Sequence, residues 1–163
     1  MDISMKRELN GLLLAVGLMI GASASAQLPG AKLSSVFPPG AKIGTTVEMA
    51  VAGTDLDGLR AAFFSHPGIT GKPSADGKKL SVTVAKDVPE GFYDTWVVGR
   101  YGASNPRAIH VTRLAEVVST TTNHDFAKAQ VVAADAMVNG QADKETVDLF
   151  KVALKKGQRL LVQ

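Results

Sequence analysis

Short stretches that alternate apolar and polar residues are the feature that most constrains how this chain folds. Val47, Met49 and Val51 alternate with polar or small residues over 46–52, and the same period of two recurs over 80–85. Successive side chains of a β-strand point to opposite faces, so this period predicts strands that are buried on one side. No amphipathic helical pattern separates these segments.

Further strands are predicted over 33–37, 59–64, 92–98 and 108–113, with turns rich in Gly, Pro, Asp and Asn between them. Pro38 is expected to end the first, an edge strand, because proline cannot donate to a sheet ladder. Residues 71–79 are expected to form a polar loop, and 92–98 a central strand with bulky groups on both faces. About six or seven short strands of this kind predict an all-β, immunoglobulin-like antiparallel sandwich.

The N-terminus has the three parts of a secretory signal peptide. Lys6 and Arg7 precede an apolar run over 12–20, and Ala24-Ser25-Ala26 offers small residues to the signal peptidase. We expect cleavage after Ala26. The apolar run is about half of the roughly 20 residues that a spanning helix needs. The processed chain is therefore predicted to be exported, to the periplasm, the cell surface or the medium, with no membrane span.

Composition excludes several classes of function. The chain has no cysteine, which rules out disulfides, thiolate metal sites and a Cys nucleophile. Its net charge is +3 and its basic residues are scattered, which does not indicate nucleic-acid binding. The densest basic run, Lys155, Lys156 and Arg159, is interpreted as a solvated turn or strand end.

The sequence contains no recognisable catalytic constellation. Ser65 and His66 are adjacent in an extended segment, so their side chains point apart and cannot readily form a triad with Asp55. His66, His110 and His124 lack the i, i+4 spacing of a zinc-binding helix, and His110 is expected to face solvent. We therefore predict no catalytic residue and no cofactor-binding residue, and we expect that this segment is not an enzyme.

Two groups of carboxylates lie in or beside glycine-containing turns. Asp55 and Asp57 form the first, and Asp143, Glu145 and Asp148 the second. Asp is common in turns because its short carboxylate accepts hydrogen bonds from nearby backbone N–H groups. We favour this interpretation over a glycosidase pair. Asp143 and Asp148 are nevertheless the candidate ligands for calcium, which prefers oxygen donors in an exported turn.

Tyr93 and Trp96 lie on opposite faces of the strand predicted over 92–98, so one of them could serve as a sugar-stacking platform. We favour a core position for Trp96, since tryptophan is commonly buried in a sandwich.

The C-terminal segments are predicted to form a second unit after a linker at 119–122. Residues 127–134 fit either a helical turn or a strand, and strands are expected over 137–139, 147–154 and 159–163, with a hairpin turn between the last two. The chain ends within an apolar strand, so we expect this unit to be incomplete, with uncovered edges and apolar surface.

Several motifs combine turn residues with strand starts in the first unit. They are Pro38-Pro39-Gly40, Gly44-Thr45-Thr46-Val47, Val51-Ala52-Gly53-Thr54-Asp55-Leu56, Val88-Pro89-Glu90-Gly91-Phe92-Tyr93-Asp94 and Gly102-Ala103-Ser104-Asn105-Pro106. With these motifs, residues 38–113 resemble the IPT/TIG-type immunoglobulin-like modules of bacterial surface and secreted proteins. The resemblance implies that the first motifs form the opening strand pair and the Val88 motif the penultimate strand.

A second group of motifs lies in the C-terminal part. It comprises Ala127, Ala129, Val138-Asn139-Gly140, Asp143, Val147-Asp148-Leu149-Phe150 and Leu154-Lys155-Lys156-Gly157-Gln158-Arg159-Leu160. With them, residues 119–163 resemble the N-terminal half of the bacterial pre-peptidase C-terminal domain, a small β-sandwich found on secreted peptidases and other surface proteins. Some members bind calcium through an opening with an acidic residue, proline and asparagines. This chain departs from that pattern, with Thr121-Thr122-Asn123-His124-Asp125.

The sequence thus predicts a signal peptide (1–26), a lead-in segment (27–37), an immunoglobulin-like sandwich (38–115) and a partial pre-peptidase C-terminal-like β domain (116–163). We expect a non-catalytic binding or spacer region of a larger exported protein, with a protein or polysaccharide ligand held by loops or a strand edge. The alternative is an accessory targeting region of a secreted hydrolase, most plausibly a peptidase, whose catalytic domain lies beyond Gln163.

Overall fold

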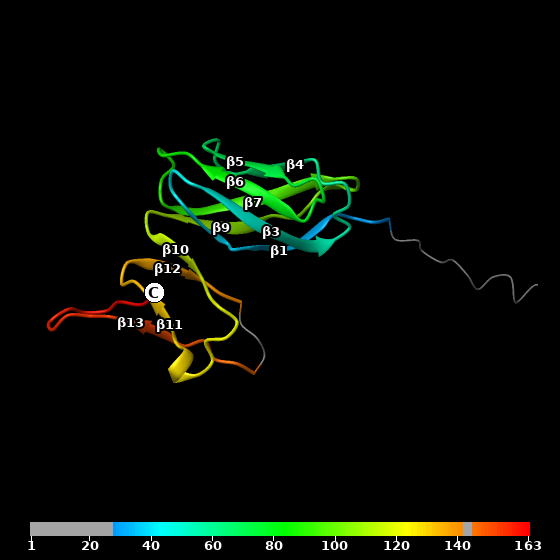
Figure 1. Cartoon of the computed structure of the whole chain (residues 1–163). Coiled ribbons are helices and arrows are strands. Elements are labelled where there is room, and N and C mark those ends of the chain that lie inside the picture. The colour runs from blue at the N-terminus through cyan, green and yellow to red at the C-terminus, as the bar shows by residue number, and fades with distance from the viewer. Residues whose placement is uncertain (1–27, 142–144) are drawn as a thin grey trace, which may run out of the picture.

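The computed structural model describes residues 28–141 and 145–163, and within them the chain is almost entirely β-structure. Figure 1 shows a larger sandwich above a smaller C-terminal part. The predicted signal peptide and its cleavage site lie outside the described residues.

Two layers of strands form the sandwich. The first layer holds, in spatial order, β1 (Lys32–Phe37), β3 (Thr46–Thr54), β6 (Lys79–Val84) and β5 (Ile69–Pro73). The second holds β4 (Ala61–Phe64), β7 (Gly91–Gly99), β9 (Arg107–Thr112) and β2 (Gly40–Lys42), and the short β8 (Gly102–Ala103) pairs with β7.

The layers are joined where β5 meets β4, through the single residue pair Ala62 and Gly71. Gly71 is needed there, because a Cβ at this position would lie 2.9 Å from the Phe64 ring. Every strand pair in the sandwich is antiparallel except β2 with β9, which is parallel. The all-β, immunoglobulin-like fold predicted from the alternation is confirmed.

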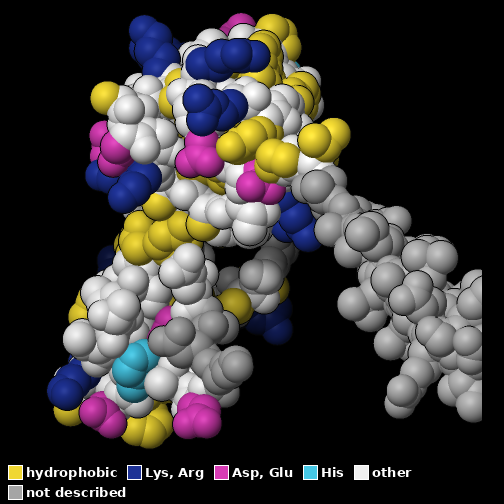
Figure 2. Space-filling model, turned by 90° about the vertical axis from the view of Figure 1, so that its right-hand side faces the viewer, with side chains coloured by type: hydrophobic (Ala, Val, Ile, Leu, Met, Phe, Trp, Pro, Cys, Tyr) yellow, Lys and Arg dark blue, Asp and Glu magenta, His cyan; other side chains and the backbone are white. Residues whose placement is uncertain are grey.

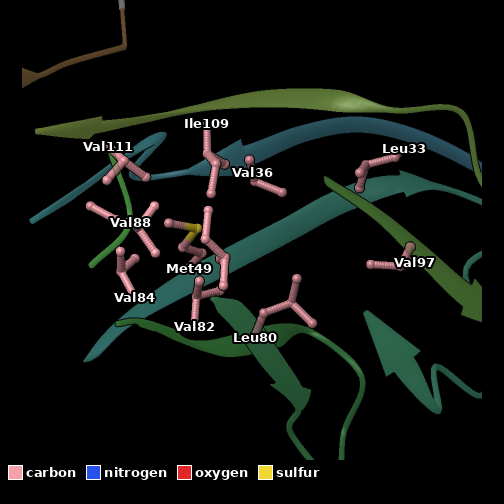
Figure 3. Close-up of a cluster of buried hydrophobic side chains, with 12 residues drawn as sticks. Leu33, Val36, Met49, Leu80, Val82, Val84, Val88, Val97, Ile109 and Val111 are labelled. Carbon is pink, nitrogen blue, oxygen red and sulfur yellow. The ribbon is translucent and has the colours of Figure 1, made fainter. Parts of the chain in front are cut away.

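The core lies between the layers and is built from the alternating apolar residues. In Figure 3, side chains of β6 and β9 point toward one another, with Met49 of β3 between them. The fully buried members include Met49, Leu80, Val82 and Ile109. Burying a side chain of this size stabilises the fold by about 1.5–3 kcal/mol, so the hydrophobic effect fixes which face of each strand points inward.

Most of the strands predicted for the sandwich are present, but β5 and the short strands β2 and β8 were not predicted. The strand expected over 33–37 is β1, an edge strand that ends before Pro38, and β7 is central, with β4 on one side and β9 on the other. The prediction of a loop over 71–79 is wrong for Gly71–Pro73, which belongs to β5 and pairs with β6. Lys79 already begins β6, so only residues 74–78 form a turn.

The C-terminal part contains two small parallel sheets. β10 (Ala115–Val118) pairs with β12 (Ala136–Asn139), and β11 (Gln130–Val132) pairs with β13 (Phe150–Val152). The segment 127–134 contains both expected structures, because the 3-10 helix Phe126–Lys128 precedes β11. The turn at Lys155–Gln158 is present, but residues 159–163 carry no strand and are exposed.

Few side chains of the C-terminal part are buried. Among its described residues Val132 is the one buried hydrophobic side chain, whereas several large apolar side chains are exposed. They are Val118, Phe126, Val131, Val147, Phe150, Leu154, Leu160, Leu161 and Val162.

A polar contact joins the two parts at Gly40 of β2. The Glu116 carboxylate accepts hydrogen bonds from Thr112 Oγ1 at 3.1 Å and from Asn139 Nδ2 at 2.7 Å. A Cβ on Gly40 would collide with Glu116 and with Asn139. Figure 2 shows the two parts as separate lobes, with hydrophobic side chains gathered where they meet.

Candidate functional site

The central strand β7 presents two chemically different faces. Its inward side chains include Thr95 and Val97, which are fully buried. Its outward side chains are Phe92, Asp94, Trp96 and Val98. The expected core position of Trp96 is therefore wrong, because the strand register places its indole on the outside of the sandwich.

Trp96 stacks on an aromatic ring of the neighbouring strand. Phe63 of β4 is its direct cross-strand partner, with ring centroids 6.3 Å apart and planes inclined by 19°. Phe63 is 49% exposed. Two nearly parallel rings on one sheet face form one continuous apolar patch.

A second stacked pair lies farther along the same strand. Phe92 pairs with His110 of β9, with centroids 4.3 Å apart and planes inclined by 11°. Phe92 is 74% exposed. The expectation that His110 points outward is confirmed, although Phe92 covers one side of its ring.

Asp94 lies on β7 between the two aromatic pairs. Its backbone is fixed by Ser65, since the Asp94 N–H donates to Ser65 Oγ at 3.0 Å and the Ser65 N–H donates to the Asp94 carbonyl at 3.0 Å. Its cross-strand neighbour is Ala108, whose methyl group leaves the carboxylate exposed. We call Phe63, Phe92, Asp94, Trp96 and His110 the outer aromatic face.

The outer aromatic face is elongated and carries little charge. Phe92 and Trp96 are four residues apart on one strand, which places them about 13 Å from each other at the usual rise of a strand. Asp94 is the one Asp, Glu, Lys or Arg at the outward positions of these strands. Those positions are Ala61 and Phe63 of β4, Phe92, Asp94, Trp96 and Val98 of β7, and Ala108 and His110 of β9.

Tyr93 anchors the start of β7 from the opposite side of the strand. Its hydroxyl donates to the Pro89 carbonyl at 2.9 Å, four residues upstream. A tyrosine bonded to the backbone in this way near the start of the penultimate strand is a recurrent feature of immunoglobulin-like sandwiches. Its ring also meets His66 edge-on. This contact helps to fix the strand that carries the outer aromatic face.

The residues considered for a triad serve separate backbone groups. Ser65 Oγ accepts from Asp94, His66 Nδ1 accepts from the Gly68 N–H at 3.0 Å, and Asp55 Oδ2 accepts from the Gly30 N–H at 3.2 Å. The His66 bond is a local turn contact, whereas the Ser65 and Asp55 bonds join residues 29 and 25 positions apart, which the sequence interpretation did not predict. Asp57 likewise lies in a turn, where its carbonyl accepts from the Arg100 N–H at 2.8 Å.

Asp148, a calcium candidate, is held in a polar cluster of the C-terminal part. Its Oδ2 accepts from Ser119 Oγ at 2.8 Å, and its Oδ1 lies 3.4 Å from His124 Nδ1. Asn123 is fully buried beside them, and its Nδ2 lies 3.4 Å from Ser119 Oγ. Asp143, the other candidate, lies outside the described residues, so the calcium pair stays a prediction. Within 28–141 and 145–163, no three His, Asp or Glu side chains gather closely enough to hold a metal ion.

The sequence contains a signal for the outer aromatic face that our interpretation did not use. Phe92, Asp94 and Trp96 are two residues apart, so their side chains lie on the same face of the strand. Since a carboxylate is seldom buried in a core, Asp94 indicates that this face points to solvent. Phe63 and His110 become part of the face only through the cross-strand register, which the sequence alone does not give. In the part of the chain that the structure describes, no helix is long and apolar enough to cross a membrane.

Comparison with known proteins shows a weak likeness to a solved structure and no family. No family model matches the chain, and no curated protein matches it. Among solved structures, SGBP-B of the mixed-linkage glucan utilization locus of Bacteroides ovatus, in complex with a mixed-linkage heptasaccharide, is similar with a TM-score of 0.38 and 23% identity. The match covers 67% of this chain and 26% of that chain, so this chain spans about a quarter of that protein.

Proposed function

We propose that this protein is a non-catalytic carbohydrate-binding module and that the outer aromatic face is its binding surface. The observation that carries the proposal is the two ring stacks on one sheet face, in which the exposed Phe63 and Phe92 pair with the half-buried Trp96 and His110. A pyranose ring has an apolar face of C–H groups and a rim of hydroxyls. Flat aromatic surfaces match the first, and a carboxylate such as that of Asp94 accepts hydrogen bonds from the second.

The surroundings of the face support binding without turnover. Asp94 is the one formally charged side chain at the outward positions of β4, β7 and β9, whereas glycoside hydrolysis requires two carboxylates, one on each side of the scissile bond.

We also propose that the sandwich is an IPT/TIG-type module and that the C-terminal part is of the pre-peptidase C-terminal type. The N-terminal leader motif supports export to a compartment where glycans are accessible.

Trp96 allows the proposal to be tested directly, because it is the single tryptophan of the chain. We expect its fluorescence to change when a panel of soluble glycans is titrated into the protein, and the change to saturate with the bound fraction. Phe63→Ala and Phe92→Ala should each weaken binding about tenfold, equivalent to about 1.4 kcal/mol, since aromatic residues commonly dominate interface energetics. Both variants keep the reporter.

Phe126→Ala is the matched control, because Phe126 is 91% exposed but lies in the C-terminal part. It should bind like the unmodified protein. Thermal unfolding of all three variants checks that the sandwich stays folded. The proposal fails if no glycan in the panel binds, or if binding is insensitive to both aromatic substitutions while Phe126→Ala behaves in the same way.

A further inference from the structure

The charge pattern of the outer aromatic face constrains the class of glycan that it can bind. A ligand that contacts both ring pairs must pass over Asp94, which is two residues from Phe92 and two from Trp96 on the same face of β7. No Lys or Arg occupies an outward position of β4, β7 or β9, and the exposed Lys42 of the edge strand β2 pairs with Thr112 and with no residue of the face. A uronate or sulfate group over Asp94 would meet a carboxylate with no cation on these three strands to compensate it, which is unfavourable.

Asp94 is available to a ligand because the protein does not use its carboxylate. None of the four ion pairs in the described residues involves it. The hydrogen bonds of this residue run through its backbone to Ser65, so the strand position is fixed while the side chain stays exposed. A charged acceptor forms stronger hydrogen bonds with hydroxyl donors than a neutral acceptor does.

The length of the outer aromatic face sets a lower limit on the length of a ligand that contacts both ring pairs. The distance of about 13 Å between Phe92 and Trp96 exceeds one sugar ring, so a monosaccharide can contact only one ring pair at a time. An extended oligosaccharide can contact both pairs and the carboxylate between them, and each added contact slows dissociation.

We propose that the outer aromatic face selects neutral, extended oligosaccharides, and that Asp94 is the specificity-determining residue, accepting hydrogen bonds from sugar hydroxyls and repelling anionic glycans. This inference rests on the proposed function, because it assigns a ligand class to the same surface.

The experiment compares two ligand series on the full protein, followed by Trp96 fluorescence. One series is a ladder of linear oligoglucosides from the monosaccharide upward, and the other is oligogalacturonides of matched length. Affinity for the neutral series should rise with chain length until both ring pairs are contacted, and then level off. The anionic series should bind at least tenfold more weakly at low salt.

Asp94→Asn removes the charge while keeping the shape of the side chain. This variant should bind the neutral oligosaccharides a few-fold more weakly, and the ratio of the affinities for the neutral and anionic series should fall. Asp135→Asn, at an exposed turn of the C-terminal part, should change neither quantity.

The salt dependence of binding by the unmodified protein gives a second test. Between about 0.01 M and 1 M the Debye length falls from roughly 30 Å to 3 Å, so anionic binding should strengthen and neutral binding should stay constant.

The outcomes separate this inference from the proposed function. Equal or tighter binding of oligogalacturonides, with loss of binding in Phe92→Ala, would overturn the inference and leave carbohydrate binding standing. The inference would also be overturned if Asp94→Asn left the ratio of the affinities for the neutral and anionic series unchanged. Absence of binding to either series would overturn both.

Discussion

At the scale of single residues, Tyr93 shows how the sandwich secures the strand that carries its outer face. The tyrosine hydroxyl donates to the Pro89 carbonyl. Tyr93→Phe removes only this hydroxyl and should lower the free energy of unfolding by about 0.5–1.5 kcal/mol, measured by denaturant titration. Tyr101→Phe is the matched control, because the Tyr101 hydroxyl forms no side-chain hydrogen bond within the described part of the chain. Equal stabilities of the two variants would contradict the anchoring role.

Trp96 shows where interpretation of single residues from the sequence fails. Its strand carries bulky side chains at both parities, and we assigned the tryptophan to the core on size. The structure buries Thr95 and Val97 instead, although threonine is the more polar residue. The strand register decides which residues of β7 point inward. Its odd-numbered residues pair with Ile109 and Ala62, and its even-numbered residues pair with His110 and Phe63. The position of Asp94, two residues from Trp96 and therefore on the same face of the strand, could have indicated that this face points to solvent.

At the scale of elements, the turn between β5 and β6 depends on the carboxylate of Asp76. Its Oδ1 accepts from Ser74 Oγ at 2.6 Å and from the Lys78 N–H at 3.1 Å. The hydrogen bond from Ser74, followed by that from the Lys78 backbone, lowers the pKa of Asp76 below its usual value. Hydrogen bonds to the charged form favour that form, so the folded turn prefers ionised Asp76.

This preference predicts a pH dependence with a defined sign. Because the pKa of Asp76 is lower in the folded state, its stabilising contribution is complete above the unfolded pKa, about 3.9. The contribution is lost as the pH falls through the folded pKa. Asp76→Ala should therefore be less stable than the unmodified protein at neutral pH, and the difference should shrink in acid. Unfolding titrations at several pH values measure it, with Asp135→Ala as control. A difference that stays constant with pH would refute this role.

Strand β5 shows the limit of prediction at the element scale. The strands with clean alternation, such as β6 with Leu80, Val82 and Val84, were predictable because burial follows the period of two. β5 was not, since Gly71 and Pro73 are turn formers with low strand propensity. Its ladder with β6 and the close approach of Gly71 to Phe64 make this segment a strand. Both contacts join neighbouring segments of the chain, but neither leaves an alternating apolar pattern in residues 69–73.

At the scale of the whole molecule, Gly40 sets how closely the C-terminal part approaches the sandwich. Gly40→Ala would push a methyl group into the Glu116 carboxylate and the Asn139 amide. Disrupting this part-buried network should cost about 1–3 kcal/mol and increase the radius of gyration in small-angle scattering. Gly30→Ala is the matched control, because nothing lies within 4 Å of its added Cβ. If both variants keep the same dimensions and melting temperature, the contact does not hold the two parts together.

The sequence predicts how the strands pair in the C-terminal part, and how this part contacts the sandwich, less well than it predicts the strands themselves. The strands β12 and β13 lie where apolar runs indicated them, but their parallel pairing with β10 and β11 was not foreseen. Parallel pairing joins segments that are distant in sequence, and no turn motif announces it. The contact of Glu116 with Gly40 has the same origin, since glycine was interpreted there only as a turn residue.

The two-sided character of β7 has an evolutionary consequence. Substitutions at Phe92, Asp94 or Trp96 leave the interior untouched, so point mutations there can change the chemistry of the outer aromatic face while the core is kept. Insertion or deletion of one residue within the strand has the opposite effect, since it would turn Phe92 or Trp96 inward and Thr95 or Val97 outward. Diversity at these three codons is therefore expected to arise by replacement and not by a change in length.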